Sequence, residues 1–159
     1  MNLSKLDSAY IAGFIDGDGS IYVQLKPNST YRYKFQIIAY VVLYQSINKG
    51  IKFFEEIQKL TNHGYIRVRK DGIAEYIFSK VNDIEFVLKN IHPYLRLKKE
   101  QASLMLDILE SKKNIQNSKD FLDVAGKIDK FYFMNYSKKR KNDAKYVEKV
   151  LRKEKLLTP

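Results

Sequence analysis

Two aspartates separated by one glycine stand near the N-terminus and are the first candidates for chemistry. Asp16 and Asp18 close the segment 10–19, with Gly17 between them and Gly19 behind. Apolar residues earlier in this segment recur at the spacing of one helix face, so both carboxylates come where a helix ends. A helix C-terminus carries partial negative charge, and two carboxylates placed there would suit a divalent cation.

This segment has two other interpretations. Asp-Gly pairs are common in turns, so an ordinary helix-ending turn is the alternative. A calcium loop is excluded, because its pattern needs a third Asp or Asn, a Gly and a distal Glu, and the chain has Ser20, Ile21 and Pro27. Asp16 lies about 200° around the helix from Asp18, so the two carboxylates are expected to differ in role, with Asp16 supporting the helix end or an interface.

The composition favours a nucleic-acid partner. The 159 residues include 29 basic and 18 acidic side chains, a net charge of +11, which suits a polyanion, although a merely basic protein is the alternative. There is no cysteine, which excludes a disulfide framework and Cys-ligated zinc. No signal peptide or apolar run of membrane-spanning length is recognised. We therefore expect one domain over 1–159, intracellular, in an organelle (chloroplast or mitochondrion) or a prokaryotic cytoplasm, with neither a membrane partner nor a small-molecule substrate.

Periodicity and turn signals predict the elements that position these residues. The expected helices cover residues 5–17, 47–61, 82–91 and 98–112, with C-terminal helices opening at Ser118 and Asn142; the expected strands cover 21–26, 32–45, 65–70 and 73–79. Asp71-Gly72 is a strong hairpin turn signal. The fold class is α+β in the order αββαββα, with a four-stranded antiparallel sheet covered by helices on one face and additional C-terminal helices.

The other face of that sheet carries side chains that could read DNA. In the major groove Arg suits guanine, Gln suits adenine, Glu suits cytosine and apolar groups suit thymine methyls. The residues expected on this face are Tyr22, Gln24, Lys26, Gln36, Ile38, Tyr40, Val42, Tyr44, Arg67, Arg69, Glu75 and Ile77. For each one alone, a solvated sheet surface is the alternative. A basic loop with Lys138, Lys139, Arg140 and Lys141 would meet phosphates.

The segment 10–19, Tyr-Ile-Ala-Gly-Phe-Ile-Asp-Gly-Asp-Gly, resembles the signature of the LAGLIDADG homing endonucleases. It occurs once, and nearly the whole chain resembles the single-motif, homodimeric branch of that family. The similar segments include Asp-Gly-Asp-Gly-Ser-Ile at 16–21, Lys-Pro-Asn at 26–28, Gly-Tyr-Ile-Arg at 64–67, Tyr-Ile-Phe-Ser at 76–79 and Pro-Tyr-Leu-Arg-Leu-Lys at 93–98.

The resemblance implies roles for individual residues. The metal-binding carboxylate falls on Asp18, assisted by the Gly17 carbonyl, and the glutamine that positions water falls on Gln45. The basic residue near the scissile phosphate is Lys49, where relatives often have Arg; Lys keeps the charge and loses the bidentate fork. The lysine of the fourth helix falls on Lys98. Gln45 as a helix cap and Lys98 as an exposed helix-start lysine are the alternatives. The resemblance adds Asn28, Thr30 and Tyr31 to the DNA-facing set.

The function implied is a site-specific homing endonuclease that requires Mg²⁺, with Mn²⁺ or Ca²⁺ able to replace it in binding. Two copies would pack their signature helices through Ala12, Gly13, Asp16 and Gly17, bind a long pseudo-palindromic double-stranded DNA site and cut both strands, leaving 3′ overhangs. A DNA-binding regulator or an RNA-splicing maturase on the same fold, without cleavage, is the alternative. The presence of both aspartates argues against the regulator, and nothing in the sequence separates the maturase.

Overall fold

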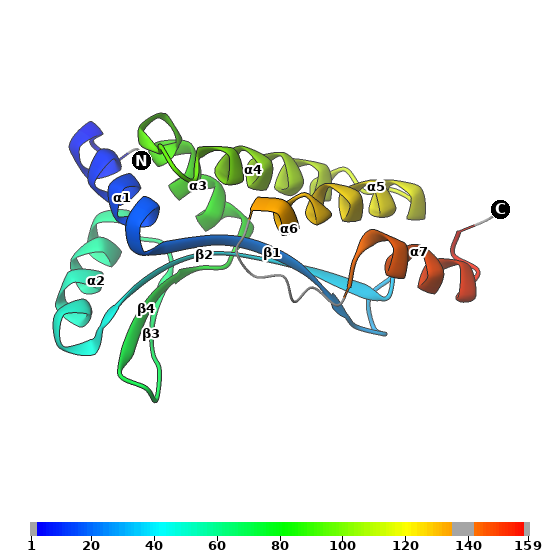
Figure 1. Cartoon of the computed structure of the whole chain (residues 1–159), viewed down its shortest axis with the longest axis horizontal. Coiled ribbons are helices and arrows are strands. Elements are labelled where there is room, and N and C mark those ends of the chain that lie inside the picture. Colours follow the sequence, from blue (N-terminus) through cyan, green and yellow to red (C-terminus); the bar gives the residue numbers. More distant parts are fainter. Residues whose placement is uncertain (1–2, 135–141, 158–159) are drawn as a thin grey trace. The chain divides into compact units, whose positions relative to one another are not determined.

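The computed structural model describes residues 3–134 and 142–157 and confirms the α+β fold (Figure 1). The elements in chain order are α1 (Lys5–Asp18), β1 (Gly19–Pro27), β2 (Phe35–Ser46), α2 (Ile47–Thr61), β3 (Tyr65–Val68), β4 (Ile73–Phe78), α3 (Val81–Ile91), the short 3₁₀ helix η1 (His92–Tyr94), α4 (Lys99–Lys113), α5 (Ser118–Asp129), α6 (Phe131–Met134) and α7 (Ala144–Lys153). The strands form one sheet in the order β1-β2-β4-β3, so β2 and β4 are central. Contacts group the chain into two compact units. The expectation of a single domain over 1–159 stays a prediction.

The first unit comprises the described parts of Met1–Tyr22 and Ala39–Ser103. Its core lies between one face of the strands and helices α1, α2 and α3. The Phe54 ring of α2 stacks on Tyr76 of β4 with the centroids 5.8 Å apart, and Phe14 of α1 meets Phe54 edge to face at 6.3 Å. Helix α3 buries Ile84, Val87, Leu88 and Ile91, the positions spaced for one helix face. This unit contains the complete signature segment.

The β3–β4 hairpin forms where Asp71-Gly72 predicted it (Figure 1). Gly72 has φ +80°, a conformation that a side chain would strain, and the Arg69 N–H donates to the Ile73 carbonyl at 2.8 Å. The register pairs Arg67 with Glu75. Strand β3 ends at Val68, two residues before the expected end, because Arg69 already belongs to the turn.

The second unit comprises the described parts of Val23–Ile38 and Leu104–Pro159. Helices α5 and α7 pack together through Phe121, Val124, Ala125 and Ile128 on one side and Val147 and Leu151 on the other. The Asn142 amide donates to the Leu25 carbonyl of β1 at 2.8 Å. Helix α7 begins at Ala144, and its N-cap is Asp143 in place of the expected Asn142, because the Asp143 carboxylate accepts the Tyr146 N–H. Helix α6 had no counterpart among the expected elements.

The expected start of the second strand at residue 32 was wrong by three residues. A turn closes between β1 and β2, with the Asn28 N–H donating to the Lys34 carbonyl at 2.8 Å. Lys34 has φ +64°, which is incompatible with an extended strand, so β2 begins at Phe35. The aromatic and basic residues before it have strand-forming types but lie in the turn.

Candidate active site

The C-terminal end of α1 presents the candidate metal ligands at the surface. Asp18 is the last residue of the helix and is exposed, as is Gly17 before it. Gly19 follows with its N–H donating to the Ile15 carbonyl, and a Cβ on Gly19 would lie 2.6 Å from the Ile15 Cα. Only glycine therefore lets the helix continue directly into β1. The last helix carbonyls lack intrahelical partners, so the Gly17 carbonyl and the Asp18 carboxylate are oxygen donors suited to Mg²⁺.

Asp16 turns away from this surface and binds another segment of the chain. Its carboxylate accepts backbone N–H groups from Arg96 at 2.7 Å, Leu97 at 3.2 Å and Lys98 at 2.9 Å. In return the Lys98 ammonium donates to the Asp16 carbonyl at 2.6 Å. The expected support of the helix end by Asp16 is thus confirmed, and its role at a dimer interface stays a prediction. Lys98 is half-buried and held beside the metal-ligand candidates.

Gln45 and Lys49 lie where β2 passes into α2. Gln45 is half-buried, and its Oε1 accepts the Ser46 N–H at 2.9 Å. Gly50 of α2 packs against it, since a Cβ there would come within 3.0 Å of the Gln45 Cβ. Lys49 is exposed on the first turn of α2. All four residues expected to act in catalysis, Asp18, Gln45, Lys49 and Lys98, therefore belong to the first unit.

The outer face of α1 is open, but one expected interface residue is absent from it. Gly13 and Gly17 are exposed, and a Cβ at either would meet nothing within 4 Å. Leu6 is 84% exposed and Tyr10 58% on the same side of the helix. Ala12 is fully buried, so the interface assignment for Ala12 was wrong. The buried face consists of Ser8, Ile11, Ala12 and Ile15; the small size of Ala12 suggested the interface, whereas its helical position directs it inward.

Tyrosines gather on the open sheet face of the first unit. The rings of Tyr22 and Tyr40 lie 5.2 Å apart. Burial, followed by the neighbouring Tyr44 and Tyr40, raises the pKa of Tyr22 to about 12. Burial and the Glu75 charge also raise the pKa of Tyr44, against a hydrogen bond with Ser20 that lowers it. These phenols stay neutral at physiological pH and combine an apolar ring with a hydrogen-bonding hydroxyl.

Three residues expected to read DNA on this face are buried. Val42 and Ile77 pair across the central strands β2 and β4 and are 3% and 2% exposed. Glu75 is 3% exposed, and its carboxylate contacts the Arg67 Nε and Nη2, each at 2.5 Å, and the Arg69 Nη1 at 3.7 Å. The hydrogen bond that Arg67 donates to Glu75 raises the pKa of Arg67. Direct base contact by Val42, Ile77 and Glu75 is contradicted by this burial, because central strands are covered by neighbours on both sides.

Arg67 and Arg69 remain available on the same face. The side chain of Arg67 is 58% exposed and that of Arg69 46%, and Arg69 also pairs with the exposed Asp71 at 2.5 Å. Glu75 therefore orients two arginines instead of contacting a base itself. The sequence predicted the hairpin but not this pairing, because the register of β3 against β4 decides which residues lie opposite each other.

The second unit carries the other residues of the DNA-facing set. Gln24 and Lys26 of β1 and Thr30 and Tyr31 of the following turn are exposed, and Asn28, Gln36 and Ile38 are half-buried. The side-chain Oδ1 of Asn28 accepts from the Thr30 N–H at 3.1 Å and the Thr30 hydroxyl at 2.7 Å, which fixes the turn. Lys138, Lys139, Arg140 and Lys141 lie outside the described residues.

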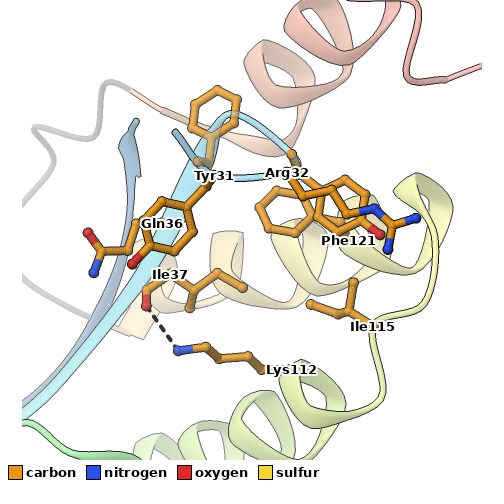
Figure 2. Close-up of a pocket in the computed structure, with 9 residues that line it drawn as sticks. Tyr31, Arg32, Gln36, Ile37, Lys112, Ile115 and Phe121 are labelled. Carbon is orange, nitrogen blue, oxygen red and sulfur yellow. Dashed lines mark hydrogen bonds between the residues drawn. The ribbon is translucent and has the colours of Figure 1, made fainter. Parts of the chain in front are cut away.

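A cavity of about 290 Å³ lies behind this turn, within the second unit (Figure 2). Its lining includes Tyr31 and Gln36 together with apolar Ile37, Ile115 and Phe121. The Lys112 ammonium enters it and donates to the Ile37 carbonyl at 3.2 Å, and burial lowers the pKa of Lys112. The cavity contains none of the residues expected to act in catalysis.

One copy of the chain offers few groups for a metal ion. Among residues 3–134 and 142–157, His, Cys, Asp and Glu side chains nowhere form a group of three or more that could hold one. A metal ion bound at Asp18 would therefore need further ligands, from backbone oxygens, water or a second copy. Within the same described residues, no helix is both long and apolar enough to cross a membrane.

The family model for LAGLIDADG endonuclease matches residues 11–107, more than half of the chain, including the C-terminal half of α1 and the whole sheet. The chain belongs to the LAGLIDADG endonuclease family. It is 36% identical to the DNA endonuclease I-CreI of Chlamydomonas reinhardtii over 143 residues, covering 89% of this chain and 86% of the relative. It is 31% identical to the DNA endonuclease I-CvuI of Chlorella vulgaris over 149 residues, covering 94% and 92%.

Solved structures show the same fold for this LAGLIDADG endonuclease. The structure of I-CvuI bound to the I-CreI target in 2 mM Mg, with the DNA not cleaved, matches with a TM-score of 0.91 at 30% identity, over 97% of this chain and 98% of the other. I-CvuI with its own target in 2 mM Ca matches equally. An archaeal intron-encoded homing endonuclease, I-Vdi141I, bound to DNA, matches with a TM-score of 0.84 at 18% identity, which supports the fold.

Proposed function

We propose that this LAGLIDADG endonuclease is a homodimeric homing enzyme that binds a long pseudo-palindromic DNA site and hydrolyses both strands with Mg²⁺, leaving 3′ overhangs. The observation that carries the proposal is the end of α1, where Asp18 and Gly17 are exposed beside a lysine fixed by Asp16. A carboxylate, a free carbonyl and an ammonium at one place suit the hydrolysis of a phosphodiester.

The open face of α1 supports a dimer. Gly13 and Gly17 leave space on which the same helix of a second copy can pack closely, and Leu6 and Tyr10 add exposed apolar surface around them. A twofold axis at this face would bring two Asp18 carboxylates together. They would repel each other until a cation neutralises them, which couples metal binding to the paired arrangement. Two copies also supply the two active sites that two strands require.

The sheet face supports DNA as the partner. Arg67 and Arg69 in the first unit and Gln24 and Lys26 in the second point away from the core. The family relatives I-CreI and I-CvuI are DNA endonucleases, and I-CvuI is seen on DNA with Mg or Ca present. A dimer would carry 2 × 11 = +22 charges, so binding should weaken steeply with added salt.

Each residue around Asp18 has its own role in the proposed hydrolysis. Bound Mg²⁺ would supply a water of lowered pKa and a positive charge at the phosphate. In this proposal Gln45 would orient water, Lys98 would stabilise negative charge developing on the phosphate oxygens, and Lys49 would bind a neighbouring phosphate. The Lys98 ammonium is already oriented by the Asp16 carbonyl at 2.6 Å. Fixed charge of this kind needs no rearrangement during the reaction.

Cleavage of a plasmid carrying the protein's own intron-insertion site tests the proposal. We expect linear product with Mg²⁺ and bound, uncut plasmid with Ca²⁺ or without metal; sequencing of the ends should show 3′ overhangs. Tight binding without cleavage in Mg²⁺ would contradict the nuclease and favour a regulator. Splicing of the intron RNA without DNA cleavage would favour a maturase. Sedimentation of the complex, with one dimer expected per site, tests the stoichiometry.

A further inference from the structure

Asp16 and Lys98 hold each other by exchanging side-chain and backbone contacts. The Asp16 carboxylate accepts the N–H groups of Arg96, Leu97 and Lys98 at 2.7, 3.2 and 2.9 Å, and the Lys98 ammonium donates to the Asp16 carbonyl at 2.6 Å. Each side chain therefore binds the backbone from which the other projects. Neither residue can shift alone without breaking hydrogen bonds made by both.

The three N–H groups lie directly before α4, which begins at Lys99. The N–H groups at the start of a helix have no partner within it, and a negative charge there is favourable. Asp16, in the last turn of α1, supplies this charge. Both of its oxygens are used, with Oδ2 accepting from Arg96 and Leu97 and Oδ1 from Lys98. Asn at this position would keep one acceptor oxygen, but its side-chain NH₂ group would replace the other oxygen and face a backbone N–H that it cannot accept.

The geometry points to Asp16 as a positioning residue for catalysis, which sets the place of the Lys98 ammonium beside the cation and the scissile phosphate. The two aspartates of the signature then divide their work: Asp18 binds the cation, and Asp16 fixes the segment that carries the active-site lysine. This role rests on the proposed nuclease function and assigns to Asp16 neither metal nor DNA contact, since its carboxylate is fully used within the chain.

The test compares Asp16→Asn with Asp7→Asn, the same substitution on the same helix. Asp7 lies in the first turn of α1, where its carboxylate accepts a hydrogen bond from the Ser4 hydroxyl at 2.5 Å. We expect Asp16→Asn to slow single-turnover cleavage in Mg²⁺ about tenfold or more, because charge-assisted hydrogen bonds are lost. Affinity for the same DNA in Ca²⁺ should stay unchanged, and Asp7→Asn should cleave at the wild-type rate. Wild-type cleavage by Asp16→Asn would overturn the role, as would a loss of rate that only follows a loss of binding or folding.

A double-mutant cycle with Lys98→Met separates positioning from general support. If Asp16 acts through Lys98, Asp16→Asn adds little to the slowing caused by Lys98→Met. Equal slowing in both backgrounds would mean that Asp16 acts only on the fold, and would overturn the proposal. If the wild-type protein cleaves no site, the proposed function itself fails. The contact between Asp16 and Lys98 can still be measured by NMR of ¹³C-methylated lysines. A Lys98 signal that moves in Asp16→Asn and stays in place in Asp7→Asn supports the contact; an unmoved signal would overturn it.

Discussion

The end of α1 and the open face of the β3–β4 hairpin both place acidic and basic residues together, but they fix them in different ways. At the end of α1, Asp16 binds three backbone N–H groups, and glycine is required at position 19 because a Cβ there would lie 2.6 Å from the Ile15 Cα. On the hairpin, Glu75 binds the side chains of Arg67 and Arg69. Backbone contacts tolerate few substitutions, whereas side-chain contacts can be exchanged. The contacts at the end of α1 therefore tolerate fewer substitutions than those on the hairpin face.

Substitution of Asp18 should have the largest effect. Asp18→Asn keeps the shape of the side chain and removes the charge that binds Mg²⁺, so we expect cleavage to slow by roughly 10³-fold, because cation stabilisation is worth several kcal/mol. DNA affinity in Ca²⁺-free buffer should be retained or improved, since repulsion between two carboxylates is relieved. Single-turnover kinetics and filter binding measure the two quantities. Simultaneous loss of binding and folding would show that Asp18 is structural and would remove the contrast between the regions.

Substitution of Gly19 tests whether backbone contacts fix the end of α1. Gly19→Ala would place a Cβ 2.6 Å from the Ile15 Cα and 2.9 Å from its carbonyl oxygen, so we expect a loss of about 1–3 kcal/mol of unfolding free energy in chemical denaturation. The matched control is Gly13→Ala, where a Cβ meets nothing within 4 Å. In a monomer the control should gain up to about 1 kcal/mol from helix propensity. Equal stability of the two variants would contradict this account of Gly19.

Substitution of Glu75 tests the side-chain contacts on the face of the β3–β4 hairpin. Glu75→Gln keeps the volume and weakens both arginine contacts, and because the arginines are largely exposed we expect a loss of only about 1 kcal/mol of stability. Discrimination among bases at one position in each half-site should fall, as in Arg67→Ala, because the arginine is no longer oriented. Cleavage of a library of sites with single substitutions measures this. A uniform loss of affinity over all sites would instead identify the arginines as phosphate contacts.

Alkaline pH should produce the smallest effect. Burial raises the pKa of Tyr22 to about 12, above its ordinary value of 10.0. The unfolded state therefore loses this proton first, and the contribution to stability is complete below pH 10 and is lost as pH rises toward 12. Denaturation between pH 9 and 12 should show a shallower decline in Tyr22→Phe than in the wild type. An identical slope would show that Tyr22 titrates normally in the folded protein.

The end of α1 and the hairpin turn could be predicted because they are encoded by local pattern, whereas Gln45, Lys49 and Lys98 were indicated only by the family resemblance. The glycines and acids of 10–19 gave the end of α1, and Asp71-Gly72 gave the hairpin turn. The start of β2 at Phe35 depended on the left-handed conformation of Lys34, which its residue type does not indicate. The burial of Val42, Ile77 and Glu75 depended on the order β1-β2-β4-β3, which alternation within single strands cannot provide. Ala12 was misplaced because its size was considered before its position on the helix.

The passage of α1 into β1 without an intervening loop has a consequence for how target sites can change. Asp18 ends the helix and Gly19 begins the strand, so no residue is available to lengthen or shorten the connection. In the proposed nuclease, the distance along DNA from the cut to the first base within reach of β1 would therefore be set by the backbone. We expect descendants of this protein to acquire new targets by exchanging side chains on the sheet while keeping the same number of base pairs between half-sites.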